Sequence, residues 1–444
     1  MLRTRARSRG GVGVALGAPA VPSMYKALAD GDSLSSSQVW SVSSTNKERR
    51  AAGYITNFAA QSYQVSDLDY TNGFGASGAK IEDMLADQAA AITYANANDI
   101  DFVSLMLGAN DVEDTGVSVA TKTTNYTTFL TAYRDCTAAP YIFVGLPTPR
   151  GDWEADLEAT RAVYVQRLHD LRAAISSVCA SLGSKVVVWD VWNDIVDTGI
   201  TNPTTGLNYY PKAGYMATDG VHLIHRGAHW AGKRMFQAFQ TTPLKIRVTS
   251  LPTVSGNESP NPTLTGTSGT FGTASSGTLP NNTRVERSSG TAATAVCSKE
   301  TTTIFGVSQE TVKIVISGGT AATEEFFFYF EYPEPTKTMD GLTGVEMMCP
   351  IKITAATGVL GVYLYGRVNQ VSTYTTLDMA FTSGNVLPTD DLPIEWLLRT
   401  EPLIVPAGSS TRYQMLVRMR LDGTVSSNGL TVNIGQPTHR RIAP

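Results

Sequence analysis

Hydrophobic and polar positions alternate in two different ways along the chain. In the first half, short apolar runs are separated by longer stretches whose apolar residues recur at helical spacing. The apolar runs predict strands at Tyr25–Ala29, Leu68–Asn72, Phe102–Leu107, Tyr141–Leu146 and Lys185–Val191. The longer stretches predict helices at residues 46–61, 79–98, 125–136, 156–182 and 226–240. Strands that alternate with helices predict right-handed βαβ units and a parallel sheet covered on both faces.

The pattern changes after residue 243. Residues 250–296 are dense in Thr, Ser, Gly, Asn and Pro, which is typical of either a linker or a set of very short strands and turns. Farther along, apolar and polar positions alternate with a period of two, as in residues 311–317, 324–332, 361–368 and 412–421. In the last of these, Tyr413, Met415, Val417, Met419 and Leu421 share one face. This half is predicted to be an antiparallel β-sandwich of jelly-roll type.

These changes divide the 444 residues into four segments, and the length suits two or three domains. We predict a basic N-terminal arm at residues 1–23, an α/β domain at 24–242, the Thr/Ser/Gly-rich segment at 243–296, and the sandwich at 297–444, which would bind carbohydrate or join subunits. The first segment has two interpretations, a secretory signal or an arm that docks on a partner.

Composition and charge narrow the function classes. Lys and Arg total 35 and Asp and Glu total 39, which gives a net charge of -4. This balance does not indicate a basic nucleic-acid-binding surface. No apolar run approaches the roughly 20 residues that a membrane-spanning helix needs. The four cysteines are far apart and form no Cys-x-x-Cys pair, so we predict neither a zinc site nor a disulfide framework, although one bridge within either half stays open.

The candidate chemistry begins at Ser33, in a Gly-Asp-Ser-Leu stretch that ends the first predicted strand. A serine hydroxyl is a weak nucleophile until a base, usually a histidine oriented by a carboxylate, removes its proton. Attack by that serine also needs donors for an oxyanion. Gly78, Asn110, Asp219 and His222 supply these groups, each at a predicted strand or helix junction. Because the carboxyl ends of parallel strands share one edge, we expect the five residues to meet there.

Each of these residues has a simpler interpretation when it is taken alone. A serine or glycine at such a junction is usually part of a turn, an asparagine often caps a helix, and a histidine is often a surface residue. Their joint occurrence, in an order that supplies a nucleophile, a base, an acid and two donors, favours a catalytic set.

Three histidines raise the alternative of a metal site, because His222, His225 and His229 are close in sequence. The Asp219-Gly220 turn and Gly227 predict that the last helix begins after His225, which separates His222 from His229. No acidic residue stands at a metal-ligand spacing beside them. We therefore expect no metal here, and we interpret His225 and His229 as surface or packing residues.

The blocks GDSL, G-x-S-G, G-x-N-D and D-x-x-H, in this order, resemble the SGNH or GDSL hydrolase family over roughly residues 24–242. The resemblance implies a flavodoxin-like α/β/α three-layer fold, no cofactor, and hydrolysis of esters, often acetyl groups on carbohydrates. It implies that Ser33 is the nucleophile, His222 the general base and Asp219 the orienting carboxylate. It also implies an oxyanion hole made by the backbone amides of Ser33 and Gly78 and the side-chain amide of Asn110.

The predicted function is a serine esterase that removes acyl groups, most simply O-acetyl groups, from a polysaccharide or a small ester through an acyl-serine. Residues 143–150 resemble the family's pocket-lining loop, which makes Pro147 a candidate substrate contact. Trp40 follows the nucleophile closely and is a second candidate, because an indole ring stacks well on a sugar. The rate should rise with pH near the ordinary histidine pKa of about 6.5.

Two further hypotheses stay open. The basic arm, the Thr/Ser/Gly-rich connector and the β-rich second half are typical of phage tail fibres and spikes, some of which carry similar hydrolase modules against host surface glycans. That hypothesis predicts a virion protein that forms a homo-oligomer, in particular a trimer, through its C-terminal half. The alternative is a secreted enzyme. Both hypotheses place the protein outside the cell. The other hypothesis is a lipase or thioesterase for longer acyl chains, although the sequence offers no long apolar lid.

Overall fold

The computed structural model describes residues 25–35, 40–42, 45–62, 66–68, 73–244, 257–319, 323–330, 337–339, 343–380, 386–422 and 428–442. The predicted basic arm at residues 1–23 lies outside these ranges. So do residues 245–256, whereas the rest of the Thr/Ser/Gly-rich segment forms mainly turns and short strands.

A five-stranded parallel sheet organises the first half of the chain. Its order is β4-β1-β5-β6-β7, with β1 at Tyr25–Gly31, β4 at Ser66–Leu68, β5 at Phe102–Met106, β6 at Tyr141–Gly145 and β7 at Val186–Trp189. Counted along the chain within this sheet, the order is 2-1-3-4-5, the flavodoxin-like order. The predicted parallel sheet is therefore confirmed, but its strand predicted at Leu68–Asn72 is found at Ser66–Leu68, and residues 69–72 lie outside the described ranges. The order reverses between β1 and β5, and ligands bind beyond the carboxyl ends of strands at such a reversal.

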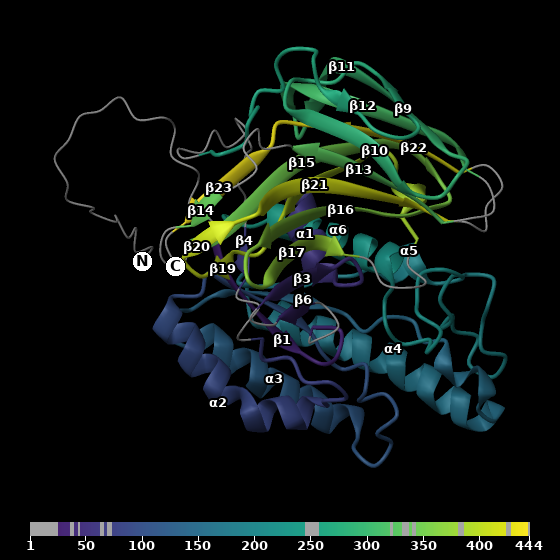
Figure 1. Ribbon diagram of the computed structural model, residues 1–444. Helices are drawn as coiled ribbons and strands as arrows, with labels where there is room; N and C mark the ends of the chain where they lie inside the picture. The colour runs from purple at the N-terminus through teal and green to yellow at the C-terminus, as the bar shows by residue number, and fades with distance from the viewer. Residues whose placement is uncertain are drawn as a thin grey trace.

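Helices cover both faces of this sheet (Figure 1). One face carries α2 (Ile81–Asn98), α3 (Val119–Asp135) and α4 (Glu158–Ser181), and the other carries α1 (Tyr54–Gln61) and α6 (His225–Gln240). Strand β5 has apolar side chains on both faces. Val103 and Leu105 pack in the cluster with α2, α3 and α4, and Phe102 and Met106 pack in the cluster with α1 and α6. Two short helical turns, η1 (Asp152–Ala155) and α5 (Trp192–Ile195), lie in the connections.

The predicted helix at residues 46–61 is wrong in its first part. Asn46–Arg50 is strand β3, which forms a hairpin with β2 (Trp40–Val42), and only Tyr54–Gln61 is helical. Strand β3 pairs in parallel with β17 (Thr373–Ala380), which belongs to the second half of the chain. The side chain of Arg49 is buried there, where it donates to the carboxylate of Glu401 and to the backbone oxygen of Arg399. These partners are more than 300 residues away, so no local pattern reveals them.

The second half, together with β2 and β3 from the first half, forms two large, mostly antiparallel sheets. One has the order β2-β3-β17-β16-β21-β13-β10-β8, and the other has the order β18-β15-β22-β12-β11-β9, with β19 and β23 also paired to β15. The bounds are β8 Thr270–Phe271, β9 Ser275–Gly277, β10 Thr283–Ser289, β11 Thr294–Ile304, β12 Val307–Gly319, β13 Glu324–Phe330, β15 Thr343–Thr357, β16 Val359–Asn369, β18 Ile394–Arg399, β19 Leu403–Val405, β21 Arg412–Leu421, β22 Asn428–Ile434 and β23 Thr438–Ile442. A separate small pair joins β14 (Lys337–Met339) and β20 (Gly408–Ser410).

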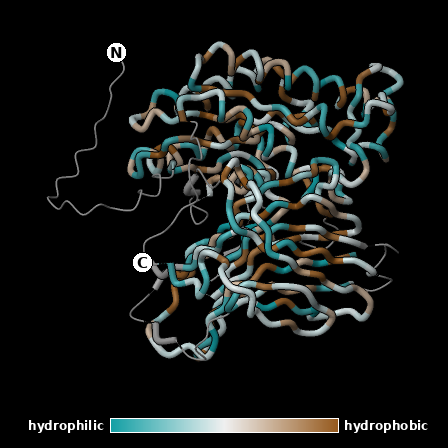
Figure 2. Tube along the Cα trace, turned by 90° about the horizontal axis from the view of Figure 1, so that it is seen from above, coloured by the Kyte–Doolittle hydropathy of each residue, from teal (hydrophilic) through white to brown (hydrophobic). Residues whose placement is uncertain are grey.

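One apolar cluster joins the two large sheets. It contains every residue predicted to face inward from β21, and it also contains Phe326, Phe328 and Phe330 of β13. Figure 2 shows brown and pale positions alternating along the strands of this half. The strand-rich character of the second half is therefore confirmed, and its classification as a jelly-roll sandwich stays a prediction.

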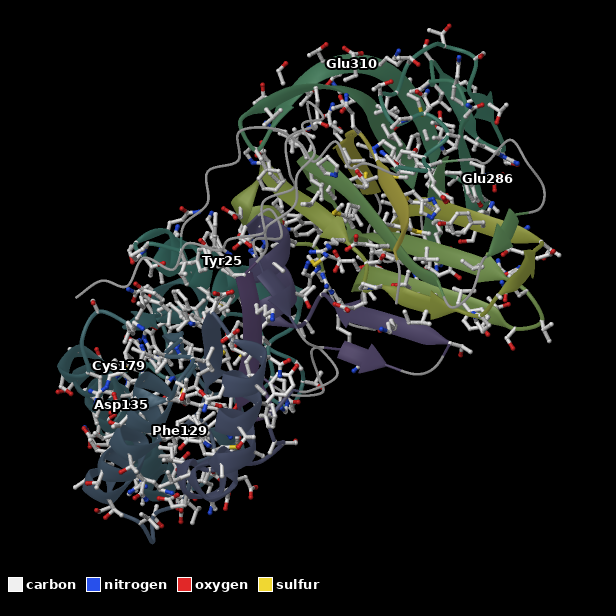
Figure 3. The ribbon with its side chains drawn as sticks, turned by 90° about the vertical axis from the view of Figure 1, so that its left-hand side faces the viewer. Tyr25, Phe129, Asp135, Cys179, Glu286 and Glu310 are labelled. Atoms are coloured by element: carbon white, nitrogen blue, oxygen red, sulfur yellow. The ribbon has the colours of Figure 1, made fainter. Side chains whose placement is uncertain are left out.

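The two halves lie against each other on the α1 and α6 side of the parallel sheet. Figure 3 shows them as two adjoining bodies, with Phe129 and Asp135 in one and Glu286 and Glu310 in the other. At the contact, the ring of His225 in α6 stacks on that of Trp396 in β18, with centroids 5.4 Å apart. Cys136, Cys179, Cys297 and Cys349 are free thiols. No helix in the described ranges is long and apolar enough to cross a membrane.

Candidate active site

Ser33 lies in a tight turn at the carboxyl end of β1. Gly31 has φ +122°, and a Cβ at this position would lie 2.0 Å from the backbone oxygen of Met106, so only glycine fits. The backbone N–H of Asp32 donates to that same oxygen at 2.9 Å, and Asp32 Oδ1 accepts from the backbone N–H of Leu34 at 3.0 Å. The turn is thereby fixed to the neighbouring strand β5.

The hydroxyl groups of Ser35, Tyr54 and Ser104 form a hydrogen-bonded chain that connects this turn to β5 and α1. Ser35 Oγ accepts from the backbone N–H of Met106 at 3.0 Å and lies 3.1 Å from the hydroxyl of Tyr54 in α1. That hydroxyl lies 2.9 Å from Ser104 Oγ in β5. All of these side chains are buried. The serine turn is therefore held by both a strand and a helix, which restricts its movement.

The last loop of the α/β half brings His222 to this turn. His222 Nε2 lies 2.9 Å from Ser33 Oγ, and His222 Nδ1 lies 2.8 Å from Asp219 Oδ2. The serine and the histidine are 189 positions apart in sequence. An imidazole that donates Nδ1–H to a carboxylate presents the lone pair of Nε2 to the serine hydroxyl, which is the tautomer that a general base requires.

Asp219 is anchored by the backbone of its own loop. Its Oδ1 accepts from the backbone N–H groups of Val221 and His222 at 2.9 and 3.0 Å. Partial burial by itself would raise the pKa of Asp219, but these amides and the His222 ring outweigh it and hold the pKa below its ordinary value. Asp219 is therefore ionised at neutral pH, as a carboxylate that stabilises an imidazolium must be.

The loops that carry Gly78 and Asn110 lie beside the serine turn. The backbone N–H of Ala76 donates to the oxygen of Gly31 at 2.9 Å, which extends the pairing of β1 towards Gly78. Asn110 Nδ2 donates to the backbone oxygen of Ala79 at 3.0 Å. The side-chain amide nitrogen of asparagine carries two hydrogens, so Asn110 Nδ2 can donate its second hydrogen to an oxyanion.

Asp111, the next residue, fixes the start of α2. Both of its carboxylate oxygens accept from the backbone N–H of Ile81, at 3.1 and 3.2 Å. Its charge is balanced by the buried ammonium of Lys122, which also contacts Glu82 at 2.5 Å and Asp114 at 2.8 Å. Burial would lower the pKa of Lys122, but the three carboxylates raise it, so the lysine stays charged. This cluster holds the Asn110 loop against the Gly78 loop.

Two buried carboxyl groups lie in the serine strand and turn. Burial raises the pKa of Asp32 to about 7, against the opposing effect of the Leu34 and Ala109 amides. Burial likewise raises the pKa of Asp30 to about 6, although the Tyr133 hydroxyl donates to it. Both groups therefore hold protons in mildly acidic solution.

The structure places Arg150, which no motif in the sequence marks, between the loops of the site. Its Nη1 donates to the backbone oxygen of Ala109 at 3.0 Å, and its Nη2 contacts Glu113 Oε1 at 2.7 Å. The adjoining Gly151 N–H donates to the oxygen of Gly220 in the histidine loop at 2.9 Å. Arg150 is the last residue of the predicted pocket-lining loop at residues 143–150, four residues after the predicted strand ends at Leu146, and its place in that loop was the available signal.

The two candidate substrate contacts have different positions. Pro147 is buried, and its backbone oxygen accepts from Arg172 of α4. Its ring lies behind the Asn110 loop, since a Cβ on Gly108 would lie 3.3 Å from Pro147 Cγ. Trp40 lies in β2, and its side chain is outside the described part of the structure.

The three histidines considered as metal ligands have different partners. His222 contacts Ser33 and Asp219, His225 stacks on Trp396, and His229 Nε2 lies 2.6 Å from Asp391 Oδ2. His225 and His229 are buried, in agreement with a packing role. The described residues contain no group of three His, Cys, Asp or Glu side chains arranged to hold a metal ion.

Comparisons with known proteins concern the same part of the chain. Residues 29–230 match the model of the GDSL-like Lipase/Acylhydrolase family. Similar solved structures include a carbohydrate esterase family 3 protein from Talaromyces cellulolyticus, at 17% identity, a TM-score of 0.34, and coverage of 49% of this chain and 97% of that one. An acetyl xylan esterase, AlAXEase, gives 18% identity, a TM-score of 0.35, and coverage of 48% and 98%.

A third similar structure is a putative GDSL-like lipase from Parabacteroides merdae, at 16% identity, a TM-score of 0.37, and coverage of 49% of this chain and 96% of that one. No curated protein matches the chain.

Proposed function

We propose that this protein is a serine ester hydrolase in which Ser33, His222 and Asp219 act as the catalytic triad. The observation that carries the proposal is the continuous chain from Ser33 Oγ through both ring nitrogens of His222 to Asp219 Oδ2, at 2.9 and 2.8 Å. The family match over residues 29–230, which contain all three residues, supports it.

The proposed reaction has two halves. Ser33 Oγ attacks the ester carbonyl while His222 Nε2 takes its proton, and the imidazolium then protonates the departing alcohol to leave an acyl-serine. A water molecule next attacks the acyl carbon, His222 takes one proton from it, and Ser33 regains a proton as the carboxylic acid leaves. Asp219 stabilises the imidazolium in both halves.

The negative oxygen of each tetrahedral intermediate needs donors that are already in place. We assign this role to the backbone N–H groups of Ser33 and Gly78 and to Asn110 Nδ2. The hydrogen bonds among the loops that carry them support this assignment, because donors fixed before the reaction need no reorganisation during it.

The proposed substrate is an acyl ester with a small acyl group and a large alcohol part, most simply an O-acetyl group on a polysaccharide. The exposure of the site supports this choice, since the side chains of His222 and Asp219 are 20% and 48% exposed. A polymer can approach a reacting pair that lies at the surface. A lipase or thioesterase acting on longer acyl chains is the alternative, and a higher kcat/KM on octanoyl than on acetyl esters would favour it.

The test compares the full chain with its Ser33→Ala variant on a short-chain aryl acetate. We expect kcat to fall by roughly 10³-fold or more, because the nucleophile is lost. Ser184→Ala, at an exposed serine in the turn before β7, is the matched control and should keep the wild-type rate. A Ser33→Ala variant that retains most of the activity would refute the mechanism. Acetate release from a panel of acetylated polysaccharides then identifies the substrate.

The virion setting and the trimer are proposals that rest on the composition of the chain. A molar mass measured in solution tests them, since a trimer supports the tail-fibre or spike hypothesis and a monomer supports a secreted enzyme.

A further inference from the structure

The strand-rich half contacts the α/β half through a loop at residues 386–393, here called the docking loop. Asp390, in the short helical turn η2 (Thr389–Asp391), accepts three hydrogen bonds from the other half. Its Oδ1 accepts from Arg226 Nε at 2.7 Å, and its Oδ2 accepts from the Tyr215 hydroxyl at 2.6 Å and from Trp230 Nε1 at 2.8 Å. Asp390 lies outside the region that matches the family model.

Tyr215 stands at the base of the loop that carries His222. The backbone oxygen of Tyr215 accepts from the N–H of Ile224 at 3.2 Å, and the N–H of Ala217 donates to the oxygen of His222 at 2.7 Å. Met216 and Leu223 form a β-bridge between these two bonds. Residues 215–224 are therefore a small hairpin whose tip holds Asp219 and His222.

Helix α6 is packed closely against the base of this hairpin. A Cβ on Gly227 would lie 2.3 Å from the backbone oxygen of Tyr215, so the helix can reach this position only with glycine. The guanidinium of Arg226 lies 4.5 Å from the centre of the Tyr215 ring. Asp390 thus bonds to both groups that meet at the base of the hairpin, namely the Tyr215 hydroxyl and the Arg226 guanidinium.

We infer that Asp390 is a positioning residue for His222, so that the strand-rich half contributes to the geometry of the proposed triad. This inference rests on the proposed hydrolase function. Asp390 acts through Tyr215: it fixes the tyrosine side chain, and through it the base of the hairpin, and so limits how far His222 Nε2 can move from Ser33 Oγ. A displacement of about 1 Å in a reacting group can cost roughly 10²-fold in rate.

Asp391 provides a matched comparison in the same docking loop. Its carboxylate accepts from His229 Nε2 at 2.6 Å and contacts Lys233 Nζ. Both partners lie in α6, later in the helix than Arg226, and Gln61 of α1 holds the other side of the His229 ring. Removing Asp391 therefore weakens the contact between the two halves by a similar amount without touching Tyr215.

The experiment uses the full chain and compares Asp390→Ala, Asp391→Ala, Tyr215→Phe and the double variant Asp390→Ala/Tyr215→Phe on an aryl acetate. We expect Asp390→Ala to lower kcat by about 10- to 100-fold with KM changed by less than about 2-fold. Asp391→Ala should keep kcat within about 2-fold of wild type. Tyr215→Phe should lose part of kcat, and the double variant should be no slower than Asp390→Ala, because the two groups act through one contact.

Urea unfolding of each variant separates this effect from a general loss of stability. Equal losses of kcat in Asp390→Ala and Asp391→Ala, or a change of KM alone, would overturn the inference. If Asp390→Ala does not fold, Tyr215→Phe decides, since an unchanged kcat in that variant also overturns it. Ser33→Ala is measured in the same series, and a Ser33→Ala variant that stays active would refute the hydrolase proposal. If Ser33→Ala is inactive but Asp390→Ala and Asp391→Ala have the same kcat, only the positioning role of Asp390 is refuted.

Discussion

The side chain of Asn110 is hydrogen-bonded to the backbone oxygen of Ala79, so the loop after β5 is joined to the loop that carries Gly78. This bond orients the amide that we assign to the oxyanion hole. Replacing Asn110 with alanine should lower kcat by about 10²- to 10³-fold and change KM little, because the donor acts on the transition state rather than on the bound substrate. Steady-state kinetics on an aryl acetate measures both constants.

Asn98→Ala is a suitable control for this prediction. Asn98 also donates its side-chain amide to a backbone oxygen, that of Tyr94 at 3.0 Å, but it lies at the far end of α2. That variant should lose a similar hydrogen bond and keep its activity. A kcat that is unchanged in Asn110→Ala, or lowered equally in both variants, would contradict the assignment.

Arg150 should influence the rate through the loop that it holds. Its guanidinium is 5% exposed and joins the oxygen of Ala109 to the carboxylate of Glu113. Arg150→Lys keeps the charge but cannot make both contacts in the same geometry, so kcat should fall by about 10-fold with a smaller change in KM. Kinetics measured below the temperature at which either protein begins to unfold provides the comparison.

Arg172→Lys is the matched control for that substitution. Arg172 is also largely buried and also donates to a backbone oxygen, that of Pro147, while its guanidinium contacts Asp190. These contacts involve no donor of the proposed oxyanion hole, so the control is read on kcat. A loss of kcat in Arg172→Lys as large as in Arg150→Lys would show that the effect comes from general loosening of the fold.

Two glycines at the site should respond differently to alanine. Gly31→Ala places a Cβ on the backbone oxygen of Met106 and should lower the free energy of unfolding by about 3 kcal/mol or more. Gly78 has φ +76°, but no heavy atom of the described residues lies within 4 Å of its would-be Cβ, so Gly78→Ala should cost about 1–2 kcal/mol. Gly78→Ala keeps the backbone N–H and should retain most of its activity. Urea unfolding measures both costs, and equal costs would contradict the argument.

The sequence predicted those features that depend on short-range order. The apolar runs predicted at Tyr25–Ala29 and Phe102–Leu107 placed Ser33 and Asn110 after two strands, which the structure pairs as neighbours. A parallel sheet brings the carboxyl ends of its strands to one edge. The alternation in β21 likewise predicted its buried face. A period of two or 3.6 residues is a property of the local chain, so it can be read without knowing the fold.

The features that the sequence did not reveal depend on partners that are distant in the chain. Residues 46–50 look helical because their polar pattern is compatible with a helix, but pairing with β17 makes them a strand. Arg150 and Asp390 are ordinary charged residues until the fold places Ala109 beside one and Tyr215 beside the other. Neither the Arg150–Ala109 contact nor the Asp390–Tyr215 contact produces a sequence spacing from which it could be predicted.

The contact between the two halves should weaken in acid because of His225. Burial beneath Trp396 lowers the pKa of this imidazole to about 3, whereas the same group in the unfolded chain titrates near 6.5. As the pH falls below about 6.5, His225 binds a proton in the unfolded state but stays neutral in the folded state. The contribution of His225 to the free energy of unfolding is therefore present above pH 6.5 and is lost progressively towards pH 3, by up to about 1.4 kcal/mol per pH unit.

His225→Phe isolates this effect, because phenylalanine keeps a ring against Trp396 and does not titrate. Urea unfolding at a series of pH values from 8 to about 4.5 gives the difference in unfolding free energy between the wild type and the variant. His229, whose pKa burial also lowers, is present in both proteins, so its contribution largely cancels. The difference should be constant at high pH and should move in favour of the variant below about pH 6.5. A difference that does not change with pH would show that His225 is not buried as a neutral imidazole.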